Sequence, residues 1–169
     1  MFTRVNLAKL TLMDALDLAS LIEIEAYQRY VLFTEQLGHS FPNDAQSVFL
    51  AMAESEKKHG EQLAERRLAL FGNTPAKVQR EDIFDVEAPD VGSTRWNMSA
   101  LKAAKVALAA EQKAYAFYDG ALAGVKQLDV KALFLELREE EAEHVQMMEA
   151  IIARLPPQAA LDLEDADAD

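Results

Sequence analysis

The sequence predicts an all-α protein, a four-helix bundle made of two antiparallel helix hairpins joined by a long crossover. Three observations predict it. Apolar residues recur at helical spacing in four long blocks, the links between these blocks are short, long and short in turn, and the two halves of the chain repeat the same motifs. Five Pro and six Gly are the only strong helix breakers in 169 residues.

The four blocks cover residues 12–37, 44–71, 99–123 and 130–155. Helix-stopping residues follow three of them: Gly38, Gly72 and the pair Pro156-Pro157. Residues suited to cap a helix N-terminus precede or open two of them: Asn43 or Asp44 for the second block, and Asn97 or Ser99 for the third. The short links make each consecutive pair of helices an antiparallel hairpin.

The middle link, residues 73–97, is long enough to run the whole length of the bundle. Its roughly 25 residues can extend to about 80 Å, whereas a 28-residue helix is about 42 Å long. We therefore expect one domain over residues 1–157. Residues 158–169 are expected to form an acidic, flexible tail, because they follow two prolines and contain few apolar side chains.

Composition excludes several classes of function. The chain has no cysteine, which rules out disulfides, iron–sulfur clusters and thiol nucleophiles. Its net charge of -12 disfavours nucleic acid and anionic lipid as partners. No apolar run reaches the roughly 18 residues that cross a membrane. The first residues contain acids where a signal peptide needs an apolar stretch, so we expect a cytoplasmic protein.

The two predicted hairpins are copies of each other. The first and third blocks each contain E-x-x-A-Y-x-x-Y, beginning at Glu23 and Glu111, and these segments hold all four tyrosines. The second and fourth blocks each contain F-L-x3-E-x-E-x-x-H, ending at His59 and His144. Two unlike patterns that recur in the same order at similar spacing indicate an internal repeat.

The repeated residues have the properties of a metal site. Each helix places one glutamate on its apolar stripe: Glu23, Glu56, Glu111 and Glu141. Four buried carboxylates without partners are very costly, and no Lys or Arg lies on these stripes near them. Two divalent cations balance four carboxylates and two neutral imidazoles, those of His59 and His144. A lone E-x-x-H is usually a solvated face, but here both copies lie on apolar stripes.

Other polar residues lie on or beside the stripes. The stripe through Glu111 continues through Tyr115 and Tyr118. We expect the hydroxyls of Tyr30 and Tyr118 to donate to ligand carboxylates, the alternative being that both rings only fill the core. Glu140 is a candidate to orient a histidine of the neighbouring helix. The remaining candidates are expected to be solvated or in a loop: Glu25, Glu54, Glu139, Glu143 and His39.

This pattern resembles the ferritin-like superfamily and, within it, the rubrerythrin-like di-iron proteins, from about Leu12 to Leu155. The resemblance implies a ferritin-like four-helix bundle. It also implies two iron ions per chain, with manganese or zinc as other occupants, held by the six residues of the repeat: Glu23, Glu56, His59, Glu111, Glu141 and His144. Two features depart from typical rubrerythrins. There is no rubredoxin domain, which needs four cysteines, and Ala114 stands where a further glutamate is expected.

The resemblance implies reaction with O2 or peroxide but leaves four functions open. The first is a redox enzyme, a rubrerythrin-like oxidase or peroxidase that takes electrons from an external donor and serves in oxidative stress. The second is a ferroxidase or iron-storage protein, which particle mass would test, since we expect a homodimer rather than a shell. The third is a hydroxylase, which needs an apolar pocket opening onto the metals. The fourth is a non-enzymatic metal-binding protein.

Overall fold

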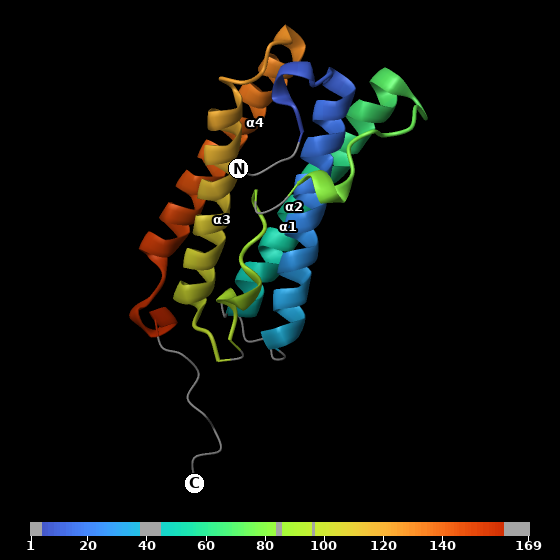
Figure 1. The fold of residues 1–169 in the computed structure, drawn as a ribbon. Coiled ribbons are helices and arrows are strands. Elements are labelled where there is room, and N and C mark those ends of the chain that lie inside the picture. The colour runs from blue at the N-terminus through green and yellow to red at the C-terminus, as the bar shows by residue number, and fades with distance from the viewer. Residues whose placement is uncertain (1–4, 38–44, 84–85, 96, 161–169) are drawn as a thin grey trace.

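The computed structural model describes residues 5–37, 45–83, 86–95 and 97–160. Four long helices form the predicted all-α bundle (Figure 1), which confirms the fold class. They are α1 (Leu12–Leu37), α2 (Ala45–Phe71), α3 (Ala100–Ala121) and α4 (Leu128–Arg154). The predicted ends of the blocks differ from these bounds by at most two residues. Four 3-10 turns complete the secondary structure: Leu7–Lys9, Arg80–Asp82, Val91–Ser93 and Pro157–Ala160.

Local side-chain chemistry fixes several helix ends. At the start of α1, the Thr11 hydroxyl accepts from the Asp14 amide, while the Asp14 carboxylate accepts from the Thr11 amide and hydroxyl. Ser99 caps α3 by accepting from the amide of Lys102, which selects it over Asn97. Gly72 ends α2 with a positive φ of 58°. Other predicted end and loop residues lie outside the described residues: Gly38, His39, Asn43 and Asp44.

The two hairpins pack as predicted, α1 against α2 and α3 against α4, and α2 also approaches α3 across the bundle. Small residues on α3 allow this approach, since seven of its alanines are buried, among them Ala103, Ala104, Ala107 and Ala110. An ion pair ties each hairpin together, Arg67 to Asp17 at 2.8 Å and Arg138 to Asp119 at 3.1 Å. A third, Arg66 to Glu136, joins α2 to α4.

The crossover between Gly72 and Ser99 runs along the bundle between α1 and α3 (Figure 1). Two of its contacts with α1 lie about two helical turns apart, since Arg80 donates to Gln28 and the Thr94 hydroxyl donates to Gln36. Between these points, residues 86–89 are all buried. The crossover is therefore part of the interior as well as a connection.

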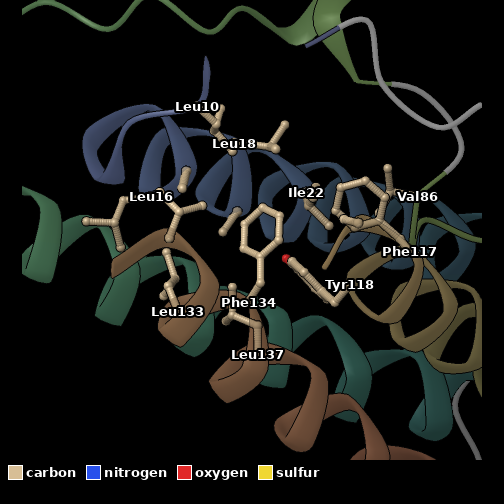
Figure 2. Close-up of a cluster of buried hydrophobic side chains, with 14 of the residues drawn as sticks. Leu10, Leu16, Leu18, Ile22, Val86, Phe117, Tyr118, Leu133, Phe134 and Leu137 are labelled. Atoms are coloured by element: carbon tan, nitrogen blue, oxygen red, sulfur yellow. The ribbon is translucent and has the colours of Figure 1, made fainter. Parts of the chain in front are cut away.

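The apolar core is divided into two clusters. One lies around the first half of α1 and the first half of α4 and includes Leu16, Phe134 and Leu137 (Figure 2). The other lies around the second half of α1 and the first half of α3 and includes Phe33 and Phe49. In every helix, the glutamate predicted as a ligand comes between the residues of one cluster and those of the other.

None of the helices in the described ranges combines the length and the apolar character that crossing a lipid bilayer requires. At the C-terminal end, the 3-10 helix Pro157–Ala160 contacts α3. The rest of the predicted tail, residues 161–169, lies outside the described residues.

Candidate metal centre

The six predicted ligands meet in the middle of the bundle as two matching half-sites. The first half-site comprises Glu23, Glu56 and His59, and the second comprises Glu111, Glu141 and His144. In each trio, one oxygen or nitrogen atom per residue lies within 4.8 Å of the others. The internal repeat of the sequence thus corresponds to a repeat of potential metal-binding groups in space.

Each histidine lies close to both glutamates of its own half-site. His59 Nδ1 is 3.8 Å from Glu23 Oε2 and 3.7 Å from Glu56 Oε2. His144 Nδ1 is 3.2 Å from Glu111 Oε2 and 3.5 Å from Glu141 Oε2. A metal bound through bonds of about 2.1 Å holds its ligand atoms about 3 to 4.2 Å apart. The measured separations therefore suit a shared cation.

The glutamates lack the partners that buried carboxylates need. All four are at most 3% exposed, and each has at least one buried oxygen without a hydrogen-bond partner among the described residues. Such groups cost free energy unless something pairs with them. Carboxylate oxygen together with imidazole nitrogen is a donor set that iron, manganese and zinc all accept. The residues present fit a pair of metal ions.

Burial perturbs the carboxyl groups strongly. Burial, and then the neighbouring Glu56, raises the pKa of Glu23 well above its ordinary value. Burial raises the pKa of Glu141 to about 8, although His144 opposes the shift. Burial also raises the pKa of Glu111. These carboxyl groups resist ionisation chiefly because burial removes the water that would stabilise their charged form.

Two groups shift in ways that reflect their partners. Burial would raise the pKa of Glu56, but His59 and the nearby carboxyl groups lower it. Burial would lower the pKa of His144, but the carboxylates of Glu111 and Glu141 raise it to about 10. In the metal-free protein the His144 imidazolium thus provides part of the positive charge that a metal ion would supply.

A fifth buried glutamate, Glu87, was missed by the sequence analysis. It lies on the crossover, is 1% exposed, and has two buried oxygens without a partner among the described residues. Glu87 forms two further groups within the same 4.8 Å limit, one with Glu23 and Glu141 and the other with Glu56 and Glu111. Glu87 has no helical periodicity to reveal it. The signal available was one acid within the apolar run at residues 86–89 of a mostly polar link.

The charge balance inferred from the sequence needs correction for this reason. Four carboxylates and two neutral imidazoles match two divalent ions, but the structure brings five carboxylates together. Burial raises the pKa of Glu87 well above its ordinary value, and the other four carboxylates raise it further.

Tyr30 and Tyr118 are completely buried near this cluster. Burial, and then the charges of nearby glutamates, raises the pKa of each phenol well above 10. Neither hydroxyl has a hydrogen-bond partner among the described residues, so donation to a ligand carboxylate stays a prediction. Tyr115, placed on the same stripe by the sequence, is 37% exposed, and Ala114 faces the interior instead.

The remaining assignments are partly confirmed. Glu54, Glu139 and Glu143 are exposed as predicted, whereas Glu25 is half-buried. Glu140 is also largely exposed, and the partial burial of its carboxyl group raises its pKa. Its role in orienting a histidine of the neighbouring helix stays a prediction.

The two sides of the centre differ. The crossover covers the side between α1 and α3, while the side between α2 and α4 carries the histidines, whose side chains are 22% and 16% exposed. An apolar groove of about 540 Å³ lies farther along α2 and α4, lined by Val48, Met52, Met148 and Ile151 among others. None of the predicted ligands lines it.

Comparison with known proteins agrees with this arrangement. The sequence model of the rubrerythrin family matches residues 14–152. The chain belongs to the rubrerythrin family. Among solved structures, it is similar to an uncharacterised conserved protein from Magnetospirillum magnetotacticum MS-1, with 28% identity and a TM-score of 0.66. The match covers 87% of this chain and 97% of the other. None of the curated proteins compared with the chain matches it.

The match to this rubrerythrin family model contains all six residues of the two half-sites and Glu87. This member contains no cysteine, so its sequence cannot form the four-cysteine iron site of a rubredoxin domain.

Proposed function

We propose that this rubrerythrin-family protein is a non-haem di-iron redox protein that reacts with O2 or hydrogen peroxide. The observation that carries the proposal is the pair of matching half-sites, whose glutamates are buried and keep oxygens without a hydrogen-bond partner among the described residues. Six residues would hold the two ions: Glu23, Glu56, His59, Glu111, Glu141 and His144. When bound, a pair of ferrous ions supplies two electrons to an oxygen species.

The residues of the chain provide the environment for this chemistry. The five carboxylates concentrate negative charge, which stabilises a rise in the charge of bound ions. The two apolar clusters on either side exclude bulk water from the centre. The partly exposed edge at His59 and His144 is the side from which a small oxidant and an external electron donor would approach.

Iron handling is the second candidate. A ferroxidase would use the same ligands but would oxidise Fe²⁺ ions in excess of the two that it holds. A homodimer, which we continue to propose, would exclude a storage shell, and particle mass tests this directly. The cytoplasmic location also remains a prediction. A hydroxylase is less well supported, because the apolar groove between α2 and α4 does not include the ligands.

The test is anaerobic loading with Fe²⁺ followed by addition of hydrogen peroxide or O2. We expect about two iron ions per chain and a rapid change in the near-ultraviolet spectrum that depends on both ions. Glu56→Ala should abolish it, whereas Glu54→Ala, which removes an exposed glutamate two residues earlier, should not. Loading with iron but no reaction with either oxidant would contradict a redox role and favour a metal-binding protein. Continued turnover of excess Fe²⁺ would favour the ferroxidase.

A further inference from the structure

The crossover delivers a side chain to the metal centre from outside the four helices. Glu87 lies between the two half-sites. It forms one group with Glu23 and Glu141 and another with Glu56 and Glu111, and each group contains one glutamate of each half-site. Both of its oxygens are buried and without a hydrogen-bond partner among the described residues. An ionised carboxylate in this state requires a cation, and the charged groups that act most on the Glu87 carboxyl are the four other glutamates.

We propose that Glu87 is a seventh ligand, which the crossover contributes between the two half-sites, and that metal binding fixes residues 86–90 onto the bundle. The proposal rests on the metal centre described above, and it concerns how that centre is completed and what its occupancy does to the fold.

Side chains of α1 and α3 hold the backbone next to Glu87. Lys113 of α3 donates from Nζ to the carbonyl oxygen of Ala88 at 2.9 Å. Arg29 of α1 donates from Nη1 to the carbonyl oxygen of Pro89 at 2.6 Å. Lys113 Nζ also lies 3.7 Å from the Asp90 carboxylate. Both cations thus contact backbone immediately after Glu87, which sets its position relative to α1 and α3.

An apolar residue anchors the other side of Glu87. Val86 is 1% exposed and belongs to the same buried cluster as Ile22 and Phe117 (Figure 2). Ile22 precedes the ligand Glu23 in the chain. Glu87 is therefore fixed between an apolar anchor before it and two charge-assisted hydrogen bonds after it, as a positioned ligand requires.

The helices leave room for this extra ligand. Ala26 and Ala114 lie one turn beyond Glu23 and Glu111 and are completely buried, but their side chains cannot bind a metal. The additional carboxylate near the half-sites is that of Glu87, which the crossover supplies. The side chain of Glu87 thereby connects the crossover to both helix hairpins.

The test uses the full chain and Co²⁺ as a redox-inert probe. Visible absorption of Co²⁺ reports its coordination number, and calorimetry reports affinity. Loss of a residue that merely supports a ligand lowers metal affinity about 10- to 100-fold, so Glu87→Gln should weaken binding of at least one ion by about tenfold or more. Its Co²⁺ spectrum should gain intensity as coordination falls. The matched control is Glu81→Gln, which alters an exposed glutamate of the same crossover.

Amide hydrogen exchange provides a second measurement that needs no variant. Co²⁺ should slow exchange in residues 86–90 of the wild-type protein, and this protection should be lost in Glu87→Gln while that of the helices remains. Unchanged affinity and spectrum in Glu87→Gln, or no protection of residues 86–90 in the wild type, would overturn the proposal. A wild-type protein that binds no Co²⁺ would instead refute the metal centre itself.

Discussion

The imidazole rings of His59 and His144 stack face to face, with centroids 4.7 Å apart and an interplanar angle of 6°. These two residues occupy equivalent positions of the internal repeat, 85 residues apart in the chain. Their stacking brings the half-sites into register on the side between α2 and α4. Two positively charged rings would repel each other in this arrangement. Protons and metal ions also compete for the nitrogen atoms of these rings, because only a neutral imidazole binds a metal.

The first prediction concerns the ligand set. Glu56→Ala and Glu141→Ala should each abolish the binding of the metal pair, because each removes a carboxylate that adjoins both its own histidine and the other half-site. Glu54→Ala and Glu139→Ala are matched controls, since they alter exposed glutamates two residues earlier on the same helices. Metal content of the purified proteins is the measurement. Full loading of either ligand variant would show that the residue is not required.

The second prediction is that metal-free and metal-loaded protein respond oppositely to pH. Folding raises the pKa of Glu141 to about 8 and of His144 to about 10, so the folded state binds more protons than the unfolded chain above about pH 4.5. Stability of the metal-free protein should therefore fall as pH rises from 5 to 8, by up to about 1.4 kcal/mol per pH unit for each such group. Glu56, whose pKa is lowered, opposes this trend only at acidic pH.

Metal binding requires deprotonated carboxylates and neutral imidazoles, so stability of the loaded protein should rise over the same range. Urea midpoints at pH 5, 6, 7 and 8, with a chelator or with saturating metal, give both slopes. Parallel slopes would contradict the assignment of the buried carboxylates as ligands. Metal retained at pH 4 would count against ligation by His59 and His144.

The third prediction moves the extra carboxylate from the crossover to a helix. Ala114→Glu alone should destabilise the protein, because it adds a sixth buried carboxylate beside Glu111 at a completely buried position. Combined with Glu87→Ala, it should recover metal binding that Glu87→Ala alone weakens. Calorimetric titration of the two single variants and the double variant measures this coupling. Strictly additive effects would mean that residues 87 and 114 do not share the metal centre.

The fourth prediction concerns the repeated phenylalanines. Phe49 and Phe134 occupy the same place in the two F-L motifs, and both are completely buried, one in each apolar cluster. Each Phe→Ala change should cost about 3–5 kcal/mol of unfolding free energy. Leu50→Ala, at a position that is 44% exposed, should cost much less. A small effect of either phenylalanine variant in urea unfolding would show that the surrounding core can collapse into the space.

Helical periodicity predicted the helices, their pairing and the six residues that meet in the two half-sites, because long amphipathic helices and a repeated motif leave strong signals. It placed Tyr115 wrongly, because positions i+3 and i+4 from Glu111 differ by a small rotation that spacing cannot resolve. The structure turns Ala114 inward and Tyr115 outward. Glu87 was missed for another reason. Its position depends on how an irregular link lies on the bundle, and on Arg29 and Lys113, whose contacts are with the backbone.

The division of the core into two clusters bears on how the protein unfolds. In the absence of metal, a layer of mutually repelling carboxylates separates the cluster around Leu16 and Phe134 from the cluster around Phe33 and Phe49. The two ends of the bundle then have little apolar contact to couple them, and each can melt at its own temperature. Ions bound across the layer would join the ends into one cooperative unit. Calorimetry should accordingly show a broad or double transition for the metal-free protein and a single sharp transition once metal is bound.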